Sequence, residues 1–261
     1  MHLNTFDHYQ QHSSWIHQLD PRVKVLVAIL FIISTALLPD GAWLAYTLSW
    51  ALVITAGLVA HIQPWFLVKR SLLVLPFLLA AVTIIFTLPG TVLWTGPYGL
   101  TITDTGLVRF LSILFRSWVS LQMAVLLTAT TRFPDVLHAL RHLKVPAILV
   151  SILAFMYRYL FVLADEVTRL LRARAARSAQ LPTQHGGRSV WWRAKIAGNM
   201  VGQLLVRSLA RSDRVYQAML ARGYRGELLT MNPHLMASLD WLILCAALLL
   251  LLLLQAIARF V

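Results

Sequence analysis

Two short triplets contain the residues of this sequence best suited to gripping another molecule. They are Ala176-Arg177-Ser178 and Ala221-Arg222-Gly223. A guanidinium group carries several hydrogen-bond donors in a fixed plane, so it binds carboxylates and backbone carbonyls with a defined direction. A small alanine beside it lets the backbone approach a partner surface closely. Taken alone, the same arginines are equally compatible with simple solvation or with attraction of anionic lipid.

Both triplets lie in a strongly basic segment that runs from Arg132 to Gly226. It carries 16 of the 23 Lys and Arg residues but only 4 of the 10 Asp and Glu residues, so most of the formal net charge of +13 lies here. The rest of the chain is apolar: hydrophobic residues make up 59% of the whole sequence, charged residues 13%, and the mean hydropathy is +0.71. This composition lies outside the range of soluble globular domains. We predict an all-α integral membrane protein whose partner is the lipid bilayer and not nucleic acid.

Five apolar stretches are expected to cross a bilayer as helices, and the first of them is short but can be extended at its ends. We expect transmembrane helices at Val23 to Leu38, Ala42 to Ile62, Ser71 to Leu88, Leu107 to Thr131 and Leu235 to Ile257. The segment from Pro89 to Thr105 is rich in glycine and is expected to be a loop, either outside the membrane or re-entrant. The predicted organisation is a lead with four spans at residues 1–131, a coupling module at residues 132–234, and a last span at residues 235–261.

The positions of Lys and Arg around these spans predict the orientation in the membrane. Short connections rich in Lys and Arg stay in the cytoplasm. Such residues precede the first span and follow the second and fourth, whereas residues 39–41 and 89–105 contain none; they are Arg22, Lys24, Lys69, Arg70 and Arg132. The N-terminus and the basic module are therefore expected on the cytoplasmic side of the inner membrane. We expect the apolar stretch from Val145 to Leu163 not to cross, because crossing would export the arginines that follow it.

Amphipathic helices are expected within the basic module. On a helix from Val201 to Tyr224, an apolar stripe faces away from three arginines. The stripe contains Val201, Leu205, Leu209, Ser212, Tyr216 and Met219, and the arginines are Arg207, Arg211 and Arg214. Gly223 suits the position just beyond a helix end, where a left-handed residue closes the last turn. This cap would leave Arg222 projecting at the tip.

Four motifs, in this order and spacing, resemble the transmembrane T component of energy-coupling-factor (ECF) transporters, and the overall length with the run from Leu205 to Gly226 suggests its cobalt or nickel branch (CbiQ-like). They are the lead Leu19-Asp20-Pro21-Arg22, the string from Thr130 through Leu140-Arg141 to Val145-Pro146, the triplet Ala176-Arg177-Ser178, and the run from Arg214 to Tyr224. The resemblance covers nearly the whole chain. Ser178 stands where many relatives have Gly, so the end of a helix is less well defined there.

The resemblance implies a non-catalytic subunit that joins two cytoplasmic ABC-type ATPases to a membrane subunit that binds cobalt or nickel. Some complexes of this kind would include a further small membrane subunit. The triplets Ala176-Arg177-Ser178 and Ala221-Arg222-Gly223 would each enter a groove on one ATPase. The sequence contains no Gly-x-x-x-x-Gly-Lys-Ser/Thr string. ATP and Mg²⁺ are therefore expected on the partner ATPases, and no cofactor is expected in this chain.

Two arginines lie inside the fourth predicted span. Arg109 and Arg116 are seven residues apart on one face of that helix, where a charge cannot comfortably face lipid. Either they pair within the helix bundle, or they line a contact with the substrate-binding subunit. Both alternatives are open at this point.

No metal site is expected. Four histidines precede the first span, without the spacing of a recognised ligand set, and are expected to be a solvated tail; they are His2, His8, His12 and His17. His138 and His142 share a helix face, but Arg141 and Lys144 beside them disfavour a cation.

Three other functions are compatible with parts of the pattern. The first is a T component that serves the uptake of a vitamin. A stand-alone secondary transporter or channel, motivated by Arg109 and Arg116, would require uptake by this chain alone. A membrane-bound enzyme would need clustered acid, base or metal groups within the spans, and the nearest carboxylates lie at or beyond span ends; these are Asp20, Asp40, Asp104 and Asp240. In the simplest alternative, the arginines of the basic module are only solvated or attract anionic lipid.

Overall fold

The structure is a computed structural model that describes residues 10, 14–74, 76, 81–95, 101–177, 190–226 and 236–260. The chain forms two compact units, one made of residues 1–143 with residues 232–261 and the other of residues 144–231. The second unit is thus inserted into the sequence of the first. The second unit begins at Lys144, and the helix before it belongs to the first unit. The coupling module expected at residues 132–234 stays a prediction.

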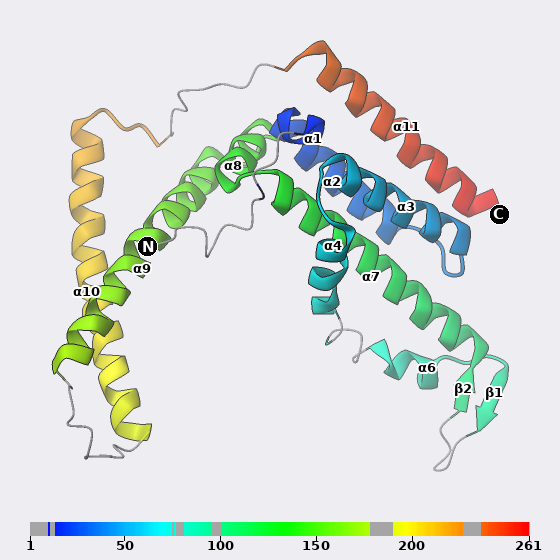
Figure 1. Cartoon of the computed structure of the whole chain (residues 1–261), viewed down its shortest axis with the longest axis horizontal. Coiled ribbons are helices and arrows are strands. Elements are labelled where there is room, and N and C mark those ends of the chain that lie inside the picture. The colour runs from blue at the N-terminus through cyan, green and yellow to red at the C-terminus, as the bar shows by residue number, and fades with distance from the viewer. Residues whose placement is uncertain are drawn as a thin grey trace. The chain divides into compact units, whose positions relative to one another are not determined.

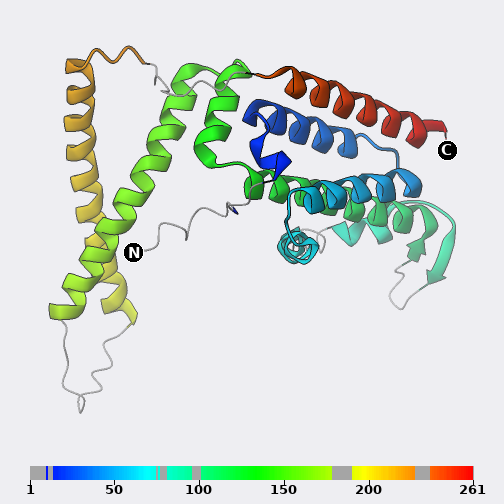
Figure 2. The ribbon, with the colours of Figure 1, turned by 45° about the horizontal axis from the view of Figure 1, so that its top comes forward.

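Helices dominate the first unit (Figure 1). They are α1 (Trp15–Gln18), α2 (Pro21–Ala36), α3 (Trp43–Val59), α4 (Pro64–Ser71), the 3-10 turn η2 (Leu72–Val74), α6 (Thr83–Thr87), α7 (Asp104–Thr130), α8 (Phe133–His142) and α11 (Ser238–Phe260). α7 packs against α2, α3 and α4, and α8 packs against α2. α11 packs against α2 and α3 and runs beside α2 in Figure 2. The helices expected for the first, second, fourth and last spans are confirmed as α2, α3, α7 and α11.

Side-chain caps define where two of these helices begin. The Asp20 carboxylate accepts a hydrogen bond from the backbone N–H of Arg22 at 2.8 Å, and Pro21 occupies the first turn, where its missing N–H costs nothing. The Thr103 hydroxyl accepts from the backbone N–H of Gly106 at 3.2 Å at the start of α7. Asp20 and Pro21 therefore mark the start of α2.

The interior of the first unit consists of small apolar clusters joined by polar contacts. One cluster unites α2, α3, α7 and α11 through Phe31, Val53, Val119, Leu251 and Leu254. Beside it, the Gln255 amide donates to the carbonyl of Ser34 at 2.7 Å, and the hydroxyls of Thr35 and Ser120 lie 2.9 Å apart. Such hydrogen bonds between helices fix their register where apolar packing alone permits sliding.

The third predicted span, from Ser71 to Leu88, is not one continuous helix. α4 ends at Ser71, a 3-10 turn follows, and α6 covers only Thr83–Thr87. Residues 75 and 77–80 lie outside the described residues. Pro76 lacks the backbone N–H that would continue the helical hydrogen-bond ladder, so a break in this segment has a direct physical reason.

A short antiparallel hairpin occupies part of the segment expected to be only a loop. Strand β1 (Val92–Thr95) pairs with β2 (Thr101–Thr103). Both strands contain β-branched residues, which favour extended backbone. β2 leads directly into α7, so the hairpin fixes the start of that helix.

The second unit contains two long helices, α9 (Ala147–Arg177) and α10 (Val190–Ala221). By length and composition, three described helices could cross a membrane: Asp104–Thr130, Ala147–Arg177 and Ser238–Arg259. α3 is apolar but shorter. Length and hydropathy test only the capacity to cross, so the expectation that Val145 to Leu163 does not cross stays a prediction.

Candidate coupling site

The second triplet forms the end of α10. Gly223 adopts a left-handed backbone conformation, with φ of +81°. Its N–H donates to the carbonyl of Leu220 at 2.9 Å, and the N–H of Tyr224 donates to the carbonyl of Met219 at 3.0 Å. These two bonds make a Schellman cap, which satisfies carbonyls left over at a helix end. The predicted helix end at Gly223 is confirmed, and Arg222 is exposed just before the turn.

The first triplet lies at the end of α9. Arg177 is the last residue of the helix, and both Ala176 and Arg177 are exposed. A cation in the last turn is favoured by the partial negative charge of the helix C-terminus. Ser178, where the end of the helix was expected to be less well defined, lies outside the described residues.

α9 and α10 are antiparallel, as the contacts between them show. The Ser151 hydroxyl near the start of α9 donates to the carbonyl of Gly226, just past the end of α10, at 3.3 Å. The Phe155 ring meets the Tyr224 ring edge-on, 6.5 Å between centroids. Further along α9, the contacts are with earlier parts of α10. Arg177 and Arg222 therefore lie at opposite ends of one helix pair.

An ion pair joins the middle of the two helices. Arg211 Nη2 donates to Glu166 Oε2 at 2.6 Å, and Arg207 Nη1 lies 3.6 Å from Glu166 Oε1. The hydrogen bond from Arg211 is the main cause that holds the pKa of Glu166 below its usual value of 4.5, and the charge of Arg211 and the contact with Arg207 act in the same direction. The two contacts lie one turn apart on α10 and share one carboxylate.

The position of Arg211 corrects the expected helix face. We expected Arg207, Arg211 and Arg214 to face away from the apolar stripe, but Arg207 and Arg211 point to α9, because both pair with Glu166. We also did not predict a role for Glu166. The sequence did indicate it: Glu166 lies three residues after Leu163 and four before Leu170, which places it on the apolar side of α9. A carboxylate on such a face needs a cationic partner.

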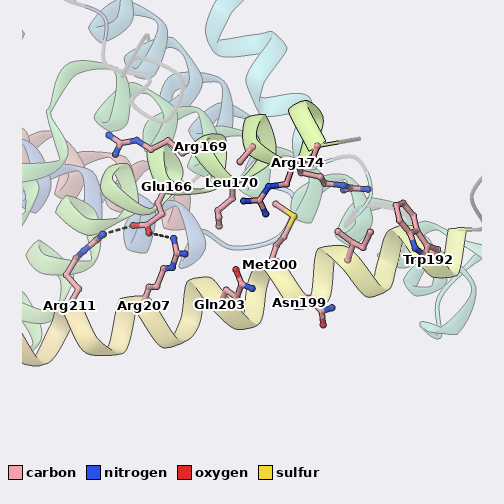
Figure 3. Close-up of a pocket in the computed structure, with 13 residues that line it drawn as sticks. Glu166, Arg169, Leu170, Arg174, Trp192, Asn199, Met200, Gln203, Arg207 and Arg211 are labelled. Atoms are coloured by element: carbon pink, nitrogen blue, oxygen red, sulfur yellow. Dashed lines mark hydrogen bonds and ion pairs between the residues drawn. The ribbon is translucent and has the colours of Figure 1, made fainter. Parts of the chain in front are cut away.

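Two grooves run between α9 and α10. The basic groove, about 720 Å³ in volume, lies between the C-terminal half of α9 and the N-terminal half of α10, and the Glu166 ion pairs cross it (Figure 3). The apolar groove, about 550 Å³, lies between the other two halves. The later part of the predicted stripe lines the apolar groove, through Leu209, Ser212, Tyr216 and Met219. That part of the stripe faces α9, as an amphipathic helix pair requires.

The two arginines of the fourth span share one carboxylate in the first unit. Arg116 Nη2 bonds to Asp40 Oδ1, and Arg109 Nε lies 3.7 Å from Asp40 Oδ2. Arg116 Nε also donates to the hydroxyl of Tyr46 at 3.1 Å. Asp40 stands in the turn between α2 and α3, so these contacts tie that turn to α7. Contact of Arg109 and Arg116 with a substrate-binding subunit stays a prediction.

Histidine side chains in the first unit bond to protein groups. Arg22 Nη2 donates to His138 Nε2 at 3.1 Å, and the His138 and His142 rings meet edge-on at 4.9 Å between centroids. Partial burial lowers the pKa of His142, and the charge of Arg22 lowers it further. Within the described part of the chain, no group of three or more His, Cys, Asp or Glu side chains could hold a metal ion. His2, His8 and His12 lie outside the described residues.

Comparison with known proteins identifies the family. The family model CbiQ, cobalt transport protein, matches residues 12–235. The energy-coupling factor transporter transmembrane protein EcfT of Leuconostoc gelidum subsp. gasicomitatum is 30% identical over 226 residues, which are 82% of this chain and 81% of that protein. The cobalt transport protein CbiQ of Salmonella typhimurium is 28% identical over 215 residues, 78% of this chain and 92% of that protein. CbiQ of Rhodobacter capsulatus is 29% identical over 143 residues, 55% of this chain and 56% of that protein.

The family match spans both structural units and includes both arginine triplets. It covers the capped start of α2, the α9–α10 pair and the turn at Gly223. The four motifs that resemble T components fall within the same residues. The chain is a multi-pass membrane protein, and it belongs to the CbiQ family of transmembrane T components of ECF transporters.

Proposed function

We propose that this T component couples two cytoplasmic ABC-type ATPases to a membrane subunit that binds a transition-metal ion, with Arg177 and Arg222 as the gripping residues. ATP and Mg²⁺ bind to the ATPases, and this chain supplies no catalytic group. Cobalt is the favoured substrate, and nickel is the next, because the family model and two relatives carry cobalt in their names. The names of the EcfT relatives specify no substrate, so uptake of a vitamin is the alternative that the assay below distinguishes.

The placement of the two arginines at opposite ends of one helix pair carries the proposal. α10 has 32 residues, and at about 1.5 Å per residue it is about 48 Å long. Arg177 lines the groove beside the start of α10, whereas Arg222 follows its last residue. One rigid pair can thus present a guanidinium to each of two separate proteins.

The tips are suited to transmitting force. The Schellman cap at Gly223 holds the backbone of Arg222 in one conformation, and the planar guanidinium makes hydrogen bonds of fixed direction. Closure of the ATPases on ATP would shift the two tips relative to each other and tilt or release the substrate-binding subunit. The Glu166 ion pairs between α9 and α10 would resist separation of the helices during that movement.

The basic module is proposed to lie on the cytoplasmic side of the inner membrane. Lys69 and Arg70 occupy the last turn of α4, and Arg132 immediately precedes α8. Both positions follow predicted membrane segments, and Lys and Arg at such positions favour the cytoplasm. This side is also where ATP is available to the partner ATPases.

The test uses the full complex, with Arg177→Ala, Arg222→Ala and the double variant. Loss of a charge-assisted contact costs about 1.5–3 kcal/mol, which corresponds to roughly 10- to 100-fold weaker association with the ATPase pair for each arginine. Co-purification of the ATPases and uptake of radioactive cobalt into vesicles should both fall, and furthest in the double variant. Uptake of nickel and of vitamins by the wild-type complex decides between the substrate alternatives.

Arg158→Ala and Arg214→Ala are matched controls, because both arginines are exposed on α9 and α10 but away from the tips. They remove the same charge and should retain association and uptake. Full uptake by the double tip variant would remove the role assigned to Arg177 and Arg222.

A further inference from the structure

One carboxylate in the first unit serves the beginnings of two helices. Asp240 lies in the first turn of α11, and its Oδ2 accepts a hydrogen bond from the backbone N–H of Ala237, just before that helix, at 2.9 Å. Its Oδ1 accepts from the backbone N–H of Asp20, the residue that caps α2, at 3.4 Å. An acidic residue in the first turn commonly reaches back to the N–H that precedes its own helix. At the corresponding position of α2 stands Val23, and α11 supplies the carboxylate instead.

This attachment is buried and electrostatically favourable. Asp240 is only 7% exposed and Asp20 only 5%. The beginning of a helix carries a partial positive charge, and the two carboxylates lie where two such beginnings meet. Hydrogen bonds to a charged group are stronger than those between neutral groups, and more so away from water. Asp240 therefore fixes the start of α11 to the start of α2 across 220 residues of sequence.

α8 is attached to the same end of α2. Arg22, two residues after Asp20, donates from its Nη2 to Nε2 of His138 on α8 at 3.1 Å. The Nε atom of Arg22 lies 3.8 Å from Asp20 Oδ1, so both attachments involve the first turn of α2. We call the four side chains Asp20, Arg22, His138 and Asp240 the polar junction.

The two helices that the polar junction attaches to α2 are those next to the second unit in the sequence. The second unit is connected to the first at residues 143–144 and at residues 231–232. α8 ends at His142, directly before the first connection, and α11 begins at Ser238, shortly after the second. Any force that the second unit exerts through the chain reaches the first unit at these two helices.

We propose that the polar junction makes α2, α8 and α11 respond together when the second unit moves. This inference rests on the function proposed above, in which the ATPases move that unit. Without the polar junction, α8 and α11 would shift separately, and much of the movement would be lost at the two connections. With it, the movement reaches α2, which packs against α7 and α11. The four side chains are positioning residues, and they contact neither substrate nor nucleotide.

Hydrogen exchange on the full-length chain in detergent tests the polar junction without its partners. Asp240→Ala should accelerate exchange of the Asp20 and Ala237 N–H groups roughly 10- to 100-fold, because both lose a charged acceptor. His138→Phe keeps an aromatic ring but cannot accept the bond from Arg22. If the contacts act as one unit, His138→Phe also accelerates exchange at Ala237, and the double variant exchanges no faster there than Asp240→Ala alone. Unchanged exchange at Ala237 in His138→Phe, or additive effects in the double variant, would overturn the proposal.

The full transport complex tests the consequence for coupling. In Asp240→Ala and in His138→Phe, uptake per ATP hydrolysed should fall about 2- to 30-fold, while the ATPases still co-purify with the chain. Asp240→Asn should lie between, since it keeps one acceptor oxygen. Thermal unfolding checks that each variant folds, and His138→Phe decides the outcome if Asp240→Ala does not.

Asp104→Ala is the matched control, because Asp104 is an exposed carboxylate in the first turn of α7 and lies outside the polar junction. It should retain uptake per ATP. Wild-type uptake per ATP in His138→Phe, or an equal loss in Asp104→Ala, contradicts the proposal. Failure of the role given to Arg177 and Arg222 is recognised separately, as ATPase association that survives their replacement.

Discussion

Replacement of Gly223 by alanine changes the backbone freedom of the α10 tip and little else. A Cβ atom at this position would meet no atom within 4 Å, so steric clash contributes nothing. The φ of +81° is the problem, because an L-residue with a Cβ rarely adopts it. The cost of the left-handed conformation is about 1–2 kcal/mol. The capped turn should therefore be about 5- to 30-fold less populated in Gly223→Ala.

A glycine-to-alanine substitution elsewhere on α10 should stabilise the helix instead of destabilising it. Gly198 and Gly202 lie within the helix, and a Cβ at either would also meet no atom within 4 Å. Alanine in a helix interior is more favourable than glycine by roughly 0.5–1 kcal/mol, because glycine loses more freedom on folding. Gly198→Ala and Gly202→Ala should thus stabilise the helix that Gly223→Ala loosens at its end.

Hydrogen exchange on the full-length chain in detergent measures the effect directly. The N–H groups of Gly223 and Tyr224 donate to the carbonyls of Leu220 and Met219, so they exchange only when the cap opens. In Gly223→Ala their exchange should be about 5- to 30-fold faster. Gly223→Asn should lie between, since asparagine tolerates this conformation better than alanine. Unchanged exchange in Gly223→Ala, or equal acceleration in Gly198→Ala, would refute the cap as the device that holds the tip.

Three further predictions test other parts of the structure. The hydrogen bond from Arg211 lowers the pKa of Glu166, so the ion pair stabilises the folded protein at pH values above the usual carboxyl pKa of 4.5. This stabilisation is lost as the pH falls through the lower pKa that Glu166 has in the folded protein. Hydrogen exchange across α9 and α10 should therefore become faster on acidification, and Glu166→Gln should remove this pH dependence. Asp40→Asn should lower stability by roughly 1 kcal/mol in thermal unfolding, because Arg116 loses its carboxylate at a partly exposed site, and Arg116→Lys with Asp40 intact should lose less. Gly106→Ala should lower the unfolding temperature more than Gly223→Ala, because its Cβ would lie 2.7 Å from a backbone carbonyl oxygen of α6 that cannot move aside.

Local patterns in the sequence were sufficient to predict most helices of the first unit and the C-terminal end of α10. Long apolar runs predicted α2, α3, α7 and α11, and Asp20 with Pro21 marked a helix start. Gly223 predicted the left-handed cap because the cost of φ above zero is a property of one residue and its neighbours. Each of these predictions depends on residues that are adjacent in sequence.

Features that depend on distant partners were harder to predict. The predicted helix face of Arg207 and Arg211 was wrong, because an isolated helical wheel contains no information about Glu166, which lies on α9, 45 residues before Arg211. The break after Ser71 was missed because apolar composition alone does not distinguish a continuous helix from an interrupted one. The hairpin ahead of α7 was assigned to a loop because its two strands are short and separated by glycine and proline.

The first unit is divided in sequence by the second unit, and this has a consequence for how the protein is synthesised and folded. Leu251 and Leu254 of α11 complete the apolar cluster around Phe31 and Val53, yet the ribosome makes α11 only after all of residues 144–231. While residues 144–231 are being synthesised, the surfaces of α2 and α3 that will pack against α11 remain uncovered. Chains that stop before α11 should therefore be degraded by membrane proteases, and only chains that contain both residues 144–231 and α11 should accumulate in the folded form.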